Sequence, residues 1–149
     1  MALEEENENR LYMEIEARAE NIGLVRLAVA TLAAQASFSV PDIEEVKVAV
    51  SEAVSNSILH GYQGRRGIIR VCATLSKQGI GISIQDEGVG MEDVGACRKS
   101  GGSGDPERLG LGFMFMQSLT DELEVESAPG RGTTVKMFKR FDTSASPRG

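Results

Sequence analysis

The sequence has no apolar run of about 18 residues, the shortest length typical of a membrane-spanning helix. Its first ten residues are acidic rather than basic and then apolar, so they do not read as a secretory signal. Its two cysteines, Cys72 and Cys97, lack the close pairing of a redox or zinc motif. We therefore expect a cytoplasmic protein whose thiols stay reduced and which has no membrane partner.

Clustered basic residues are also missing. The chain carries 16 lysines and arginines against 22 acidic residues, a formal net charge of −6, and the basic side chains are scattered along it. Because neutralising nucleic-acid phosphates requires clustered Lys and Arg, we expect no direct contact with nucleic acid. An effect on transcription would have to pass through another protein.

The length of 149 residues, 41% of them hydrophobic, is typical of one domain with a substantial core. No internal repeat interrupts it. We predict a single folded domain over 11–140, preceded by a flexible N-terminus at 1–10 and followed by a flexible tail at 141–149.

Hydrophobic periodicity and turn residues predict the secondary structure. The expected helices cover 21–35, 42–61, 92–99 and 111–119, and the expected strands cover 11–17, 68–75, 80–85, 122–127 and 133–138. Asp42 is expected to cap the second helix. The run 99–105 is too poor in apolar residues to order itself and predicts a mobile functional loop. Hairpins favour an α+β fold, a two-layer sandwich with a mostly antiparallel mixed sheet and helices on one face.

The helix over 42–61 carries the first candidate site. Glu52 and Asn56 are four residues apart and therefore share one helix face. A carboxylate can accept a proton from a hydroxyl group, and an amide oxygen can bind Mg²⁺, which prefers hard oxygen ligands. The spacing alone is more typical of an ordinary polar, solvated helix face, since polar pairs four residues apart stabilise many helices.

A second candidate follows the strand 80–85, where Asp86 precedes Gly88 and Gly90. A carboxylate at a strand end can accept a hydrogen bond from an amino group such as that of adenine. Glycines let the backbone turn tightly and approach a ligand without Cβ collisions. The alternative interpretation is a simple turn.

Two further glycine motifs complete the set. Residues 107–113 read ERLGLGF, a glycine pair at the start of a helix whose amides can hold a phosphate, with Arg108 as a nearby cation. It is neither a Walker loop nor a dinucleotide fingerprint. Residues 130–134 read GRGTT, which by itself predicts a hairpin turn.

Taken together, the four motifs resemble the GHKL (Bergerat) ATP-binding fold of gyrase-type topoisomerases, heat-shock chaperones and histidine kinases. Within that superfamily, residues 50–62 (VSEAVSNSILHGY) look like the N box of the anti-sigma F factors of spore-forming bacteria. Residues 107–113 and 124–135 look like later segments of the same family. The resemblance extends over about 11–139.

The resemblance implies a serine-protein kinase that uses ATP and Mg²⁺. Such proteins are homodimers that sequester a sigma factor and phosphorylate a serine on an anti-anti-sigma protein, which then stops competing. It implies that Glu52 is the general base and Asn56 the Mg²⁺ ligand, and that Arg26 contacts the sigma factor and the anti-anti-sigma protein. The implied nucleotide-binding residues are Asn56, Asp86, Gly88, Gly90, Arg108, Leu109, Gly110, Gly112 and Thr133.

Two alternatives remain open, and a departure from the family pattern favours the first of them. At 99–106 this chain reads KSGGSGDP, shorter and richer in glycine than the family's lid segment. An ATP-dependent sigma-binding module without kinase activity fits that change, although the retained Glu52 argues against it. A stress-response switch kinase acting on a different sigma factor is the second alternative.

Overall fold

The computed structural model describes residues 8–92 and 105–141, with the backbone alone at 105–109. The elements in chain order are β1 (Asn9–Glu16), η1 (Ala19–Asn21), α2 (Ile22–Ala33), α3 (Val40–Asn56), η2 (Ser57–Gly61), β2 (Ile68–Leu75), β3 (Gly79–Asp86), α5 (Asp105–Leu119), β4 (Glu122–Ser127) and β5 (Thr133–Arg140). No helix in this part of the chain is both long enough and apolar enough to cross a membrane.

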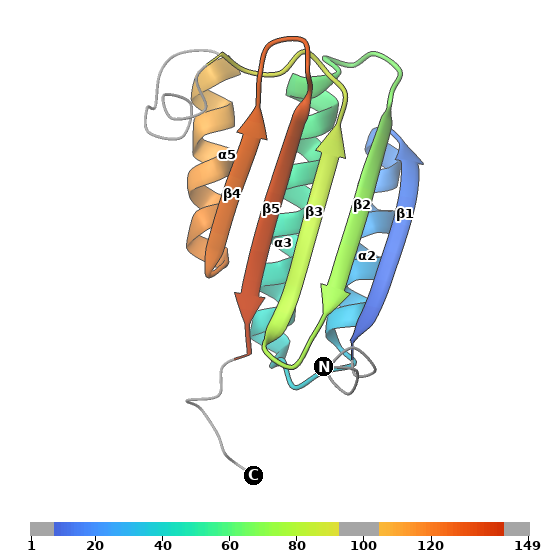
Figure 1. The fold of residues 1–149 in the computed structure, drawn as a ribbon, viewed down its shortest axis with the longest axis vertical. Helices are drawn as coiled ribbons and strands as arrows, with labels where there is room; N and C mark the ends of the chain where they lie inside the picture. Colours follow the sequence, from blue (N-terminus) through green and yellow to red (C-terminus); the bar gives the residue numbers. More distant parts are fainter. Residues whose placement is uncertain (1–7, 93–104, 142–149) are drawn as a thin grey trace.

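The strands form one sheet in the order β1-β2-β3-β5-β4. Figure 1 shows α2, α3 and α5 together on one face of this sheet, with α3 between the other two helices. The predicted α+β two-layer sandwich is therefore confirmed. All four strand pairings in the described part are antiparallel, so the sheet is more regular than the mostly antiparallel mixed sheet we expected.

Alternation along the strands explains why only one face is covered. In β2, Ile69, Val71, Ala73 and Leu75 are buried against the helices, whereas the residues between them lie on the other face. Successive side chains in a strand point to opposite faces, so this period of two gives the sheet one apolar side. Buried side chains of α2 and α3, including Val29, Val50 and Val54, complete the core.

The start of α3 differs from our prediction. Ser39, not Asp42, is the N-cap, and its hydroxyl accepts a hydrogen bond of 3.2 Å from the Asp42 amide. Pro41 lies in the first turn, where its fixed φ and missing N–H cost nothing. Asp42 is therefore inside the helix, where its charge favours the positive end of the helix dipole.

Apart from the start of α5, the described boundaries of the predicted elements lie within two residues of the predictions. The expected helix over 42–61 is continuous, but its last turn, η2, is a π-helix. The helix α5 begins at Asp105, six residues before the expected start at 111. The predicted helix over 92–99 and the predicted loop over 99–105 lie almost entirely outside the described residues.

Candidate functional site

The centre of the candidate site is the carboxylate of Asp86 at the end of β3. Only 3% of this residue is exposed. Its Oδ1 accepts a hydrogen bond of 2.9 Å from the Gly88 amide, and the Ser57 hydroxyl and the Thr133 amide also donate to the carboxylate. Burial raises the pKa of Asp86 above its usual value, and these three hydrogen bonds partly offset that effect.

Glycines allow the backbone to close around Asp86. A Cβ on Gly61 would lie 2.9 Å from the Asp86 carboxylate, and a Cβ on Gly88 would collide with the Gly61 carbonyl oxygen. Gly132 has a φ of +76°, and a Cβ there would collide with the Asp86 carbonyl oxygen. These close approaches explain why small residues surround the carboxylate.

The second and fourth sequence motifs meet in the structure. Gly90 has a φ of +75° and packs against the Ala128 carbonyl in the β4–β5 turn. The Gly130 amide donates to the Val89 carbonyl at 2.7 Å. Thr133 lies at the start of β5 opposite Asp86, with its hydroxyl 2.8 Å from the Ser127 hydroxyl. The predicted residues Asp86, Gly88, Gly90 and Thr133 therefore form one cluster.

The first and third motifs meet at the contact between α3 and α5. A Cβ on Gly112 would lie 3.0 Å from Oε1 of Glu52 and 3.2 Å from Nδ2 of Asn56. Glu52 and Asn56 are half-buried, so they do not form the solvated face that spacing alone allows. The absence of a side chain on Gly112 lets α5 approach both polar groups closely.

The two halves of the site are joined through one helix. Asn56 precedes Ser57, whose hydroxyl donates to the Asp86 carboxylate. The Nδ2 atom of Asn56 is buried and has no hydrogen-bond partner among the described residues. Because a buried amide without a partner is costly, this atom marks a position where a bound group would complete the hydrogen bonding.

These residues fit a nucleotide and Mg²⁺. Asp86 offers a buried acceptor for a base amino group, and rotation of the Asn56 amide presents an oxygen suited to Mg²⁺. Within the described part of the chain, no three His, Cys, Asp or Glu side chains gather as a metal centre. A single protein oxygen is sufficient where Mg²⁺ keeps waters and binds substrate phosphates.

Four other predicted residues are not joined to this cluster by any described contact. Gly110 is a buried position of α5. Arg108 and Leu109 belong to the same helix, but their side chains lie outside the described residues. Arg26 is exposed on α2, and its Nη1 atom donates to the Ser51 hydroxyl of α3 at 3.2 Å. Arg26 is therefore near α3 but does not contact Asp86 or its glycines in any described hydrogen bond.

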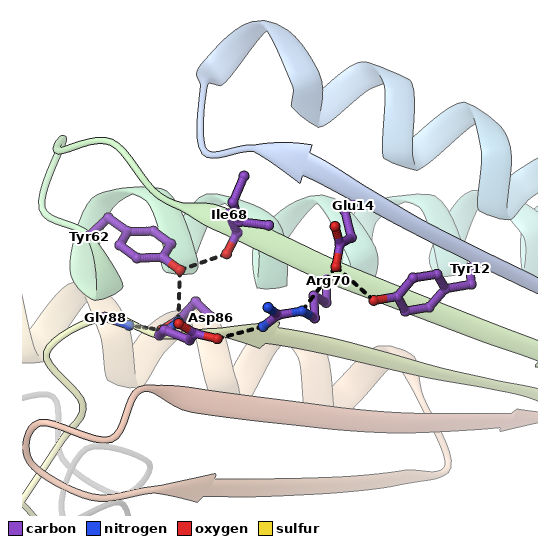
Figure 2. Close-up of polar contacts among 8 residues, drawn as sticks. Tyr12, Glu14, Tyr62, Ile68, Arg70, Asp86 and Gly88 are labelled. Carbon is purple, nitrogen blue, oxygen red and sulfur yellow. Dashed lines mark hydrogen bonds and ion pairs between the residues drawn. The ribbon is translucent and has the colours of Figure 1, made fainter.

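Sequence reasoning missed Ser57, Gly61 and Tyr62. Ser57 is buried, with 4% of the residue exposed, and its hydroxyl donates a hydrogen bond to the Asp86 carboxylate. Tyr62 accepts a hydrogen bond from the Glu87 amide at 2.8 Å (Figure 2). A buried serine on an apolar stripe, followed by Gly-Tyr at the helix end, was the available signal.

Comparison with known proteins defines the class. The sequence pattern of the histidine kinase-like ATPase domain family matches residues 15–139. The fold resembles the RsbU and RsbW domains of a Mycobacterium tuberculosis protein, with a TM-score of 0.66, 23% identity, and coverage of 89% of this chain and 32% of that one. A histidine kinase domain from Erythrobacter litoralis gives a TM-score of 0.53 at 17% identity, covering 83% of this chain and 60% of that one. The chain is a histidine kinase-like ATPase domain.

Curated relatives narrow the class further. The anti-sigma F factor of Clostridium acetobutylicum is 37% identical over 136 residues, which cover 90% of this chain and 95% of the relative. The anti-sigma F factor of Thermoanaerobacter pseudethanolicus is 41% identical over 133 residues, covering 88% and 93%. The chain belongs to the anti-sigma F factor family, as its sequence motifs predict.

Proposed function

We propose that this protein is an ATP-dependent serine-protein kinase that acts as an anti-sigma factor in the cytoplasm. It sequesters a sporulation sigma factor and phosphorylates a serine on its anti-anti-sigma antagonist. The observation that carries the proposal is the meeting of Glu52, Asn56 and Gly112. The residue after Asn56, Ser57, links this contact to the buried Asp86 carboxylate. Membership of the anti-sigma F factor family supports the choice of a sporulation sigma factor over that of a stress-response switch kinase.

The binding half of the site recognises ATP. Asp86 accepts a hydrogen bond from the adenine amino group, while the backbone at Gly88 and Gly90 and the side chain of Thr133 line the base. On α5, the backbone at Gly110 and Gly112 lies along the phosphates, with Leu109 in the same segment. Arg108 adds a positive charge near the transferred phosphate.

The catalytic half of the site, formed by Glu52 and Asn56, positions the incoming serine. Asn56 would hold Mg²⁺, which neutralises phosphate charge when bound. Glu52 accepts the proton of the serine hydroxyl as its oxygen bonds to the γ-phosphorus and the bond from that phosphorus to the bridging oxygen of ADP breaks. Phosphoryl transfer depends mostly on positioning and charge stabilisation, so fixed geometry between α3 and α5 supports this chemistry.

Arg26 is proposed to bind the protein partners. It lies exposed on α2 and donates to Ser51, the residue before Glu52. This placement allows a bound sigma factor or anti-anti-sigma protein to approach the catalytic half. We propose that the protein acts as a homodimer and touches neither nucleic acid nor membrane.

The test is phosphoryl transfer itself. Purified protein is incubated with labelled ATP, Mg²⁺ and a candidate anti-anti-sigma protein, and the labelled residue is mapped. We expect phosphoserine on the partner. ATP binding with sigma capture but no transfer would contradict the kinase assignment and support an ATP-dependent binding module instead.

A further inference from the structure

The turn that carries Asp86 is held from outside the site by Tyr62 and Arg70. We propose that these two side chains are positioning residues that fix the Asp86 carboxylate and thereby set the preference for adenine over guanine nucleotides. The inference rests on the proposed function, because it assumes that Asp86 reads the base of a bound nucleotide.

Tyr62 holds the backbone of the turn. Its hydroxyl accepts a hydrogen bond of 2.8 Å from the Glu87 amide and donates one of 2.6 Å to the Ile68 carbonyl (Figure 2). The ring packs directly over Gly67, where any Cβ would overlap it. Both hydrogen-bonding capacities and the ring position of Tyr62 are therefore committed to joining β2 to the turn.

Arg70 holds the side chain of Glu87, the residue whose amide Tyr62 binds. Its Nη1 atom is 2.7 Å from Oε2 of Glu87, and its Nε atom is 3.1 Å from Oε2 of Glu14 on β1. The guanidinium therefore bridges the two carboxylates, and Figure 2 shows its contact with Glu14. Because Arg70 lies on β2, an interior strand paired on both sides, it connects Glu87 to a rigid element.

Glu87 separates the two residues whose geometry matters for the base. Asp86 precedes it, and Gly88, whose amide donates to the Asp86 carboxylate at 2.9 Å, follows it. The Val89 amide binds the Gly61 carbonyl at 2.9 Å. If Glu87 shifts, the Gly88 amide shifts with it, and the carboxylate loses one of the three donors that orient it.

An oriented carboxylate discriminates between bases. Adenine presents an exocyclic amino donor where guanine presents a carbonyl oxygen, which a fixed carboxylate repels. A carboxylate that can move pairs less well with adenine and can meet the ring N–H of guanine instead. Loosening the turn should therefore weaken ATP binding more than GTP binding.

The experiment measures the dissociation constants of ATP and GTP by calorimetry for the wild type and for Tyr62→Phe. We expect wild type to prefer ATP and Tyr62→Phe to lower the GTP-to-ATP ratio of Kd by about 3- to 10-fold, the usual net effect of one hydrogen bond. Tyr12→Phe is the matched control, because the Tyr12 hydroxyl donates to Glu14, which is linked to the turn only through Arg70. It should leave the ratio unchanged.

A second variant, Arg70→Gln, loosens the turn through an exposed ion pair and should lower the ratio by a smaller factor of about 2 to 3. It decides the question if Tyr62→Phe does not fold. An unchanged GTP-to-ATP ratio of Kd in the folded variants would overturn the inference while leaving the proposed function intact. Equal weakening of ATP and GTP binding counts as an unchanged ratio. Wild type that binds ATP without preference would do the same. Wild type that binds neither nucleotide would overturn the proposed function as well.

Discussion

Replacing Gly112 with alanine separates stability from function. Gly112 lies within α5, where glycine costs about 1 kcal/mol relative to alanine, so helix propensity favours the substitution. The new Cβ would lie 3.0 Å from Oε1 of Glu52 and 3.2 Å from Nδ2 of Asn56. Both contacted atoms lie at the ends of side chains, and these ends can move by a few tenths of an ångström.

We therefore expect Gly112→Ala to keep or raise the Tm while it displaces the proposed base and Mg²⁺ ligand. A misplacement of about 1 Å can cost on the order of 100-fold in rate, so this smaller shift should reduce phosphoryl transfer by about 10-fold. Thermal melts and single-turnover label transfer measure the two effects.

Gly81→Ala is the control for this substitution. Its Cβ would meet Phe138 at 3.6 Å, an ordinary contact away from the α3–α5 interface. Its transfer rate should equal that of the wild type. Undiminished transfer by Gly112→Ala would refute the claim that α5 must approach Glu52 and Asn56 this closely.

Three other predictions concern single side chains. Asn56→Ala should weaken Mg²⁺-ATP binding by about 10- to 100-fold in calorimetry, since a lost bond to a charged group costs about 1.5–3 kcal/mol; unchanged affinity would contradict this role. Lys139→Met removes a 2.8 Å ion pair with Glu45 and should lower the free energy of unfolding in urea by about 1–3 kcal/mol, whereas an unchanged midpoint would count against that pair. Burial raises the pKa of Asp86 in the folded state. The contribution of Asp86 to stability is therefore present below its pKa in the unfolded chain, near 3.8, and is lost as pH rises through its pKa in the folded protein. The Tm of Asp86→Asn minus that of wild type should therefore increase as pH is raised through this range, and a flat difference would be inconsistent with the shift.

Strands were the easiest elements to predict from the sequence. The alternation in β2 determines which side faces the helices, and its bounds match the prediction at both ends. Helix starts were harder because several polar residues compete to cap them. Ser39 and Asp42 both suit an N-cap, and only the position of Pro41 in the first turn favours Ser39.

Residue patterns predicted the motifs of the candidate site one by one, and only the family resemblance implied that they form one site. Spacing shows that Glu52 and Asn56 share a helix face, yet it does not show that α5 brings Gly112 against them. The contact between Tyr62 and Glu87 spans 25 residues and depends on how β2 and β3 pair. Such contacts follow from tertiary packing, which local patterns do not encode.

The most direct test of the kinase assignment is the Glu52→Gln variant, measured for ATP affinity and for transfer to the anti-anti-sigma protein in the same preparation. Loss of a general base should slow transfer by about 10²- to 10⁴-fold while ATP affinity stays near that of the wild type. Transfer at the wild-type rate would contradict the assignment of Glu52 as the base and, with it, the mechanism proposed for this site.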